Sequence, residues 1–524
     1  MMANEVHDST VSARGFYGNG RMAVRCVQLL FVIIAVIHLN APFLSAHNER
    51  QNQTYDVARH IFSDGWSAVL SPKVSFSLPG FEAQPYTVVR YEFPFPGLIS
   101  WPFVELFGHE RAVMRLVSVV FALASIELIF LILRQWLSSG VAAAGAALWG
   151  LSPLVLHFGQ VPMPDIFCTT GMLAAFWFAL RNNLPASSSA FLFAILSKIS
   201  VIVFGLPILT ALLAARKIKS SKEFSVVSLL WGIVPLLGIA GWNSLQLFHT
   251  DTPWTITEIS QRGIHLFSFV TYVSFFACLL PFGLGLVGVV GGILAITQRR
   301  LSLVDPFILW SLVVSNLIYL IFIFGKIPEP QYAVPLLAWA VILAAFGLGW
   351  LVDESRRNNR WRLVLAAMIG LQVLTVAVFA ADLKSNHVAD FEGVEKAAGL
   401  IPPKSRVLVV YPFYGASPAV WLNQNDYAIN RISDLQTKLT TLEKDGFDYL
   451  LIMDMKSWLF VKNGGMAAIV ARLPHPASLI SAKTTDFADP ASPFRHFCDS
   501  RFTPVYSSPY VVLYRLPTPG NQPN

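Results

Sequence analysis

The chain has 524 residues, of which 54% are hydrophobic and only 13% are charged. Soluble domains carry about 25% charged residues, so this composition excludes a set of soluble domains and favours a protein that crosses a membrane many times. The net charge of +7 does not indicate nucleic-acid binding, because the Lys and Arg residues lie mostly in short clusters between apolar runs, where they set membrane topology. The four cysteines are widely scattered and show no spacing typical of a metal site or a disulfide framework.

The N-terminal end sets the expected orientation of the chain. Residues 1–25 are polar and carry Arg14, Arg21 and Arg25 just before the first apolar run. By the positive-inside rule we expect this segment to be cytoplasmic, so that the chain emerges on the outer side at residue 47. A cleaved signal peptide fits less well, because the leader is too long and the apolar run is long enough to span a membrane.

Nine further apolar runs follow, at 111–134, 140–157, 166–181, 187–215, 224–245, 274–297, 303–325, 331–351 and 362–382. All the basic loops between them lie on the cytoplasmic side only if 187–215 crosses the membrane twice. At about 20 residues per span this run is too short for two ordinary helices. We therefore expect two short, closely joined helices broken around "LSKIS", residues 196–200, and about eleven membrane segments in all.

The outer face is expected to hold one large loop, residues 47–110. Loops of this length in compact proteins tend to be functional or disordered, and its aromatic and proline content argues against disorder. Within it, "YDVARHIFSDGW" predicts an amphipathic interfacial helix with Tyr55, Val57, Ala58, Ile61 and Phe62 on one side. A structured, half-apolar loop of this kind predicts a lid over a cavity.

The tail of the chain is less apolar than the rest. It alternates possible strands, "RVLVVYP", "YLLIMDM" and "YVVLYRL", with helical stretches such as "ISDLQTKLTTLEKDGF", which predicts a small α/β domain. The expected domains are a cytoplasmic segment 1–25, a transmembrane domain 26–382 that includes the outer loop, and an extracytoplasmic α/β domain 383–524. The glycine-rich run 283–294 predicts close packing of membrane helices.

Several polar motifs occur in a fixed order between residues 25 and 350. They are Arg50, Gln51, Gln53, Thr54, Ala58 and Arg59; Glu92, Phe93 and Pro94; Gly108, Arg115, Leu116 and Ser118; Met163, Pro164 and Asp165; Lys198; and Tyr332 with Pro335. In this order the chain resembles integral-membrane glycosyltransferases of the GT-C type. It is most similar to the bacterial family 39 group, which is related to dolichyl-phosphate-mannose–protein mannosyltransferases and aminoarabinose transferases.

The resemblance implies transfer of a sugar, a hexose or a pentose, from a polyprenyl-phosphate carrier to a lipid, glycan or protein acceptor on the non-cytoplasmic face. It implies an integral membrane protein of the bacterial inner membrane, surrounded by membrane lipids. We expect no cofactor and no partner nucleic acid. We also expect no metal, because His157 and His265 have no partner at ligand spacing.

The expected chemistry assigns roles to these residue types. An acceptor hydroxyl needs a carboxylate to take its proton, and the departing lipid phosphate needs cations or N–H donors. We expect the base among Glu49, Asp165 and Glu92, with Glu49 first and Asp165 as its closest rival. The expected substrate-binding residues are Arg50, Gln51, Gln53, Thr54, Arg59, Lys198 and Tyr332.

One departure from the family pattern leaves the base open. Relatives often have an acid directly before the threonine, whereas this chain has Gln53, an amide that cannot accept a proton from the acceptor. Purely structural roles also stay open for the three acids and the lysine. Glu49 could be a solvated helix-start residue, and Glu92 could pair with Arg90 or Arg115. Asp165 could cap a helix, and Lys198 could be a snorkelling lysine.

Other functions are also compatible with these features. A flippase or transporter for a lipid-linked saccharide, or a ligase or polymerase of the same envelope pathway, would be polytopic with polar outer loops too. Transporters usually show two related halves with broken helices near the bilayer midplane. Here the polar residues gather on one face and no echo between halves is visible, which favours the transferase.

Overall fold

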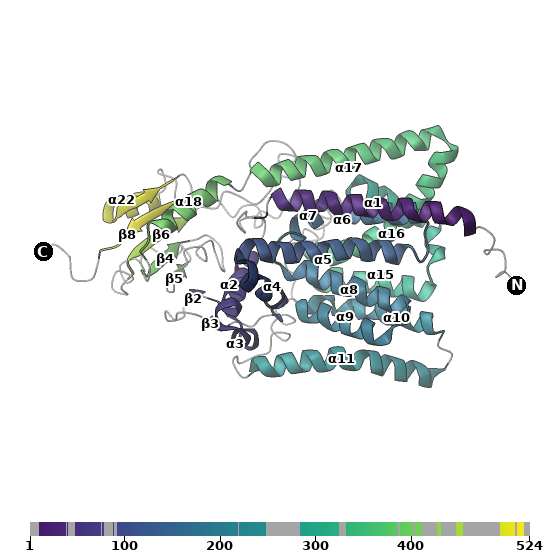
Figure 1. Ribbon diagram of the computed structural model, residues 1–524, viewed down its shortest axis with the longest axis horizontal. Coiled ribbons are helices and arrows are strands. Elements are labelled where there is room, and N and C mark those ends of the chain that lie inside the picture. Colours follow the sequence, from purple (N-terminus) through teal and green to yellow (C-terminus); the bar gives the residue numbers. More distant parts are fainter. Residues whose placement is uncertain are drawn as a thin grey trace. The chain divides into compact units, whose positions relative to one another are not determined.

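The structure is a computed structural model of the whole chain (Figure 1). It describes residues 10–37, 39, 48–74, 76–77, 87–88, 92–217, 220–247, 283–323, 332–385, 388–402, 405–410, 427–430, 447–453, 493–508 and 511–517. The chain divides into two compact units. The first, here called the membrane unit, comprises Met1–Leu39 and Met114–Ala380; the second, here called the sheet unit, comprises Asn40–Val113 and Ala381–Asn524.

The membrane unit is built from helices. They are α1 (Thr10–Ile37), the greater part of α5 (Glu110–Leu133), α6 (Ser139–Gly150), α7 (Pro153–Phe158), α8 (Pro164–Leu180), α9 (Leu184–Ser197), η1 (Ile199–Phe204), α10 (Gly205–Arg216), α11 (Ser221–Leu247), α14 (Gly285–Thr297), η3 (Arg300–Leu303), α15 (Pro306–Ile323), α16 (Ala333–Arg357) and α17 (Asn359–Ser385). Among the described residues, six helical segments are long and apolar enough to cross a membrane, and shorter apolar helices accompany them. The chain is therefore a polytopic helical membrane protein, as expected. The number of eleven spans stays a prediction.

The break expected at "LSKIS" is present in the structure. Helix α9 ends at Ser197, Lys198 has extended backbone angles (φ −161°, ψ 111°), and the 3₁₀ helix η1 starts at Ile199. The run 187–215 is thus two joined helical pieces, and this prediction is confirmed. The run 140–157 is also divided, into α6 and α7, because Ser152 precedes Pro153 and takes an extended conformation that a helix interior does not allow.

Small residues let the membrane helices approach each other closely. Helices α14 and α16 pack against each other, and a Cβ added at Gly291 or at Gly347 would meet the backbone of the opposite helix. Helix α8 packs on α9 in the same way, with Gly171 beside the carbonyl oxygen of Ala190. The close packing predicted for the glycine-rich run is therefore confirmed.

The sheet unit begins with the first long loop. It holds α2 (Asn48–Asp64), α3 (Trp66–Leu70), the short strands β1 (Lys73–Val74), β2 (Phe76–Ser77) and β3 (Thr87–Val88), and α4 (Phe95–Phe107). Helix α2 includes residues 55–64 of the predicted helix and ends before Gly65 and Trp66. On its predicted apolar side Val57, Ala58 and Ile61 are buried, and Phe62 is half-buried. Helix α2 packs on α4, where any side chain larger than that of Gly97 would collide with Ala58 and Ile61.

The tail supplies most of one mixed sheet. Its elements are α18 (Val388–Gly399), β4 (Val407–Val410), β5 (Tyr427–Asn430), β6 (Tyr449–Met453), α22 (Pro493–Arg501), β7 (Thr503–Ser507) and β8 (Val511–Arg515). The strand order is β2-β5-β4-β6-β8-β7; β2, β5, β4 and β6 are parallel, and β8 and β7 each run antiparallel to their neighbour. The three strands predicted from sequence are β4, β6 and β8. The helix predicted in "ISDLQTKLTTLEKDGF" falls on residues outside the described ones.

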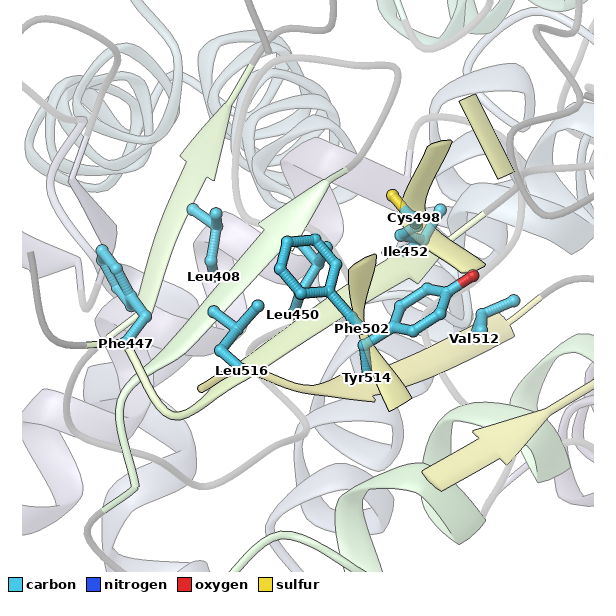
Figure 2. Close-up of a cluster of buried hydrophobic side chains, with 9 residues drawn as sticks. All are labelled: Leu408, Phe447, Leu450, Ile452, Cys498, Phe502, Val512, Tyr514 and Leu516. Carbon is cyan, nitrogen blue, oxygen red and sulfur yellow. The ribbon is translucent and has the colours of Figure 1, made fainter. Parts of the chain in front are cut away.

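One strand of this sheet comes from the first loop. Phe76 and Ser77 of β2 pair in parallel register with Tyr427 and Ala428 of β5. The apolar core on the sheet is shown in Figure 2, where Leu450 and Ile452 of β6 and Val512 and Tyr514 of β8 lie close to Phe502. The loop and the tail therefore belong to one compact unit.

Candidate functional site

Asp165 lies in the first turn of α8. Pro164 occupies the first helical position, where its fixed φ suits the start of a helix, and Asp165 follows it. The helix cap is Met163, which makes no side-chain bond, so Asp165 does not cap the helix. Its carbonyl oxygen accepts hydrogen bonds from the hydroxyl of Thr169 (2.7 Å) and the thiol of Cys168 (3.1 Å), while its carboxylate is fully buried.

Lys198 lies at the break between α9 and η1. Its N–H still donates to the carbonyl oxygen of Ala194 (3.0 Å), and its own carbonyl accepts from the N–H of Val201 (3.3 Å), so the break leaves these backbone groups satisfied. The residue as a whole is only 6% exposed. A snorkelling lysine places its ammonium group in water or among lipid headgroups, whereas this ammonium group is inside the protein.

The ammonium group of Lys198 contacts both Asp165 and Tyr332. Its Nζ lies 2.5 Å from Oδ1 of Asp165 and 3.8 Å from the centre of the ring of Tyr332, which precedes α16. Three predicted site residues from three separate segments therefore meet at one buried point of the membrane unit. The second carboxylate oxygen of Asp165, Oδ2, is also buried and has no hydrogen-bond partner among the described residues.

Other polar groups are buried in the same part of the chain. Residues 158–165, from the end of α7 to the start of α8, are all buried. Arg115 donates to the carbonyl oxygen of Gln160 (3.0 Å), and the Gln160 amide donates to that of Leu156 (2.7 Å). Gln160 was not predicted as a site residue, because a single glutamine in a short loop has no sequence signal that separates it from a solvated one.

Helix α2 of the sheet unit carries the polar cluster that the sequence singles out. Gln51, Thr54 and Asp56 are buried, with exposed fractions of 0%, 3% and 1%, whereas Gln53 and Arg59 are half-buried. Glu49 and Arg50 lie in the first turn of this helix, and their side chains fall outside the described ones. The buried Asp56 was missed, because one acid on a polar helix is more often solvated.

The first turn of α5 holds α2 through hydrogen bonding. The hydroxyl of Tyr55 donates to Glu110 (2.7 Å), and the guanidinium of Arg59 lies 3.9 Å from the same carboxylate. Burial, together with the neighbouring carboxylate of Glu110, raises the pKa of Tyr55. Tyr55 therefore remains a neutral hydrogen-bond donor.

Glu92, the third candidate acid, lies just before α4 and is 5% exposed. Arg90, one of the two partners considered for it, falls outside the described residues. The structure thus brings together Asp165, Lys198 and Tyr332 in the membrane unit. It places Gln51, Gln53, Thr54 and Arg59 on one helix of the sheet unit. Within the described residues no group of three His, Cys, Asp or Glu side chains could hold a metal ion.

Part of the chain is similar to a known protein family. Residues 92–242 match the family model of the dolichyl-phosphate-mannose-protein mannosyltransferases, a segment that includes Asp165 and Lys198. No curated protein sequence matches the chain.

Solved structures share the fold. ArnT from Cupriavidus metallidurans, bound to undecaprenyl phosphate, has a TM-score of 0.57 at 15% identity, covering 95% of this chain and 99% of that one. The archaeal oligosaccharyltransferase AglB from Archaeoglobus fulgidus, in complex with an inhibitory peptide and a dolichol-phosphate, has a TM-score of 0.52 at 12% identity, covering 82% and 69%. The arabinofuranosyltransferase AftD from Mycobacteria has a TM-score of 0.53 at 14% identity, covering 95% and 40%. The chain therefore has the fold that these solved structures share, and residues 92–242 within it match the mannosyltransferase family model.

Proposed function

We propose that the protein transfers a sugar from a polyprenyl-phosphate carrier to an acceptor on the non-cytoplasmic side of the membrane. The observation that carries the proposal is the buried ammonium group of Lys198, held by Asp165 at a helix break inside the matched family segment. Broken helices at membrane depth are tolerated where they are buried in protein or line a cavity. A similar fold binds undecaprenyl phosphate in ArnT, which supports a lipid-phosphate leaving group here.

The reaction breaks one bond and forms another at the anomeric carbon of the donor sugar. The bond from this carbon to the phosphate oxygen breaks, and its electron pair leaves with the polyprenyl phosphate. The acceptor hydroxyl oxygen forms the new bond to the same carbon, and its proton passes to a carboxylate. The protein therefore has to stabilise negative charge on the phosphate and to supply a base.

Lys198 is the proposed group that holds the phosphate. An ammonium group has three N–H donors. One points to Oδ1 of Asp165, and the ring of Tyr332 covers a second side at 3.8 Å. Asp165 is fully buried, so it serves better to position Lys198 than to contact an acceptor directly. A charge held in place before the reaction stabilises the transition state without reorganisation at the moment of transfer.

The residues of α2 are assigned to the donor and the base. Arg50, Gln51, Gln53, Thr54 and Arg59 supply cations, amides and a hydroxyl for the phosphate and the sugar. Glu49 is the proposed base, and Glu92 supports it. The amide of Gln53 at the position of the usual acid suits a sugar hydroxyl, since an amide both donates and accepts hydrogen bonds.

The finer specificity follows from the family resemblance. We infer that the sugar is a hexose or a pentose and that the acceptor is a lipid, a glycan or a protein. The proposed location is the inner membrane of a bacterium, with the N-terminus in the cytoplasm.

The test is an assay of purified protein in detergent with polyprenyl-phosphate sugars, in which release of polyprenyl phosphate is followed. Loss of one positive group from a partly dry phosphate site costs about 30- to 1,000-fold in rate. Lys198→Ala should show this loss, whereas Lys222→Ala, a change at an exposed position of α11, should not. A transporter would move the sugar-carrying lipid across a vesicle membrane and would form no free polyprenyl phosphate. That result would refute the transferase.

Sidedness needs its own measurement. Ser63 of α2 and Ser500 of α22 are exposed in the sheet unit, and Ser302 is exposed in η3 of the membrane unit. In a cysteine-free background, a membrane-impermeant thiol reagent added to intact cells should label Ser63→Cys and Ser500→Cys but not Ser302→Cys. Labelling at Ser302 alone would reverse the proposed orientation.

A further inference from the structure

The junction of α16 and α17 carries a dense group of exposed arginines. Arg356 and Arg357 end α16, Asn358 has extended backbone angles, and Arg360 and Arg362 lie in the first turn of α17. All four arginine side chains are exposed. Among the described residues none of the four forms an ion pair within 4.0 Å.

A neighbouring element adds to this charge. The 3₁₀ helix η3 packs on α16, and Arg299 and Arg300 lie at its start. Three acids are close in sequence: Asp305, which accepts a hydrogen bond from the N–H of Phe307, and Asp353 and Glu354 in the last turns of α16. Six arginines against three acids leave this end of the membrane unit with an excess of positive charge. We call these six arginines the arginine cluster.

An apolar surface adjoins the arginine cluster. Leu363, Val373 and Leu374 on α17 are 72%, 60% and 58% exposed, and only 11% of the apolar span of this helix is buried. At the charged end of the helix the rings of Trp350 and Trp361 meet edge to face, with centroids 5.2 Å apart. Tryptophan is enriched where a membrane meets water, so a tryptophan pair beside the arginines suits a site at the level of the lipid headgroups.

We propose that the arginine cluster, the tryptophan pair and the exposed face of α17 form a binding site for an anionic phospholipid. The guanidinium groups take the phosphate and the negative headgroup, and the apolar face of α17 takes the acyl chains. Guanidinium groups match phosphate oxygens in bidentate geometry, and basic residues at a membrane surface attract anionic lipids. This site is separate from the proposed catalytic pair and does not depend on the proposed reaction.

Topology alone is a weaker explanation of the cluster. Positive charge beside a span fixes the orientation of the chain during insertion, and the other basic loops of this protein carry between one and four basic residues, as in Arg216, Lys217, Lys219 and Lys222 around the junction of α10 and α11. Orientation requires neither a tryptophan pair nor an exposed apolar helix face beside the charge. Charge complementarity together with these apolar features fits a lipid with a negative headgroup.

The test uses purified full-length protein in detergent, where orientation plays no part. The protein is stripped of lipid and mixed with equal amounts of phosphatidylglycerol and phosphatidylcholine that have the same acyl chains, and bound lipids are counted by native mass spectrometry. We expect preferential retention of phosphatidylglycerol. The double variant Arg360→Gln/Arg362→Gln should weaken this retention about 30-fold, because each basic residue near an anionic surface contributes about fivefold.

The control is Lys217→Gln/Lys222→Gln, which removes the same charge from another junction at exposed positions. This variant should retain as much phosphatidylglycerol as the unmodified protein. In a second control, inorganic phosphate added to the unmodified protein at the concentration of the lipid should not displace phosphatidylglycerol. Should the arginine variant fail to fold, salt added to the unmodified protein must still release phosphatidylglycerol before phosphatidylcholine. Equal retention of both lipids by the unmodified protein, or equal loss in both double variants, would overturn the proposal.

Discussion

Lys198 and Asp165 are 33 positions apart, and their side chains form a buried ion pair with 2.5 Å between Nζ and Oδ1. Both charges are removed from solvent, since the side chains are 7% and 0% exposed. Such a pair gives little net stability, because the desolvation of two ions offsets their attraction. A small net contribution to stability is compatible with the proposed role of Lys198 as a fixed positive charge.

The first prediction concerns the stability of this pair. Asp165→Asn should lower the free energy of unfolding by about 3–5 kcal/mol, since it leaves a buried ammonium group without its counter-charge. The double variant Asp165→Asn/Lys198→Met should be more stable than Asp165→Asn alone, because it removes the orphaned charge. Thermal unfolding of the purified protein in detergent measures both. Lys198→Met alone completes the comparison. If the free-energy changes of Asp165→Asn and Lys198→Met simply add in the double variant, the two side chains do not interact, and the ion pair is not formed.

The second prediction concerns the sheet. Ser77 of β2 and Ala428 of β5 are register partners, although one belongs to the first loop and the other to the tail. A short bis-thiol crosslinker should join Ser77→Cys to Ala428→Cys in a cysteine-free background. Arg515 of β8 lies four strands from β2, which is about 19 Å at the usual strand spacing, so Ser77→Cys/Arg515→Cys should not be joined. Equal crosslinking of the two pairs would contradict the strand order.

Local features of the chain could be predicted where one physical rule decides them. The break at Lys198 followed from the length of the run 187–215 and the side on which basic loops must lie. The strands β4, β6 and β8 followed from short apolar runs rich in valine and isoleucine. These features depend on composition over a few residues, and tertiary contacts do not alter them.

Features that depend on distant contacts could not be predicted in the same way. Strand β2 has two residues and no alternating pattern, so only its pairing with β5 reveals it. The burial of Gln51 and Asp56 on a polar helix results from packing, which no helical periodicity indicates. The pairing of Lys198 with Asp165 likewise requires α8 and α9 to lie side by side. The sequence shows the two residues but not this packing of the helices.

The third prediction concerns pH. Burial lowers the pKa of His60 below its ordinary value of 6.5, with Lys73 and Arg59 acting in the same direction and Asp56 and Asp64 opposing them. The unfolded chain therefore takes up a proton before the folded one does, and stability should fall as the pH falls below 6.5 towards the folded-state pKa. His60→Gln should remove this part of the pH dependence.

Unfolding midpoints between about pH 7.5 and pH 5 give the measurement, above the range in which carboxylates with ordinary or lowered pKa values titrate. The pKa of Asp64 is lowered by the hydroxyl of Ser63 and by Lys73, so its contribution is lost only at more acidic pH. A slope that is the same in His60→Gln and in the unmodified protein would show that His60 is not the group responsible.

The last prediction separates the candidate bases. Glu49→Gln preserves the shape of the side chain, so donor affinity should stay within about threefold of the unmodified value. Transfer should fall by about 10²–10⁴-fold if this carboxylate accepts the acceptor's proton. Asp165→Asn should instead weaken donor binding as well as transfer, because it acts through Lys198, which it leaves without its partner at 2.5 Å. Glu223→Gln, exposed on α11, controls for the loss of a carboxylate. Donor affinity measured by lipid-phosphate competition and transfer measured by product formation distinguish the two roles. If Asp165→Asn abolishes transfer with donor affinity intact while Glu49→Gln does not, Asp165 is the base, and the polar residues of α2 serve only to bind the donor.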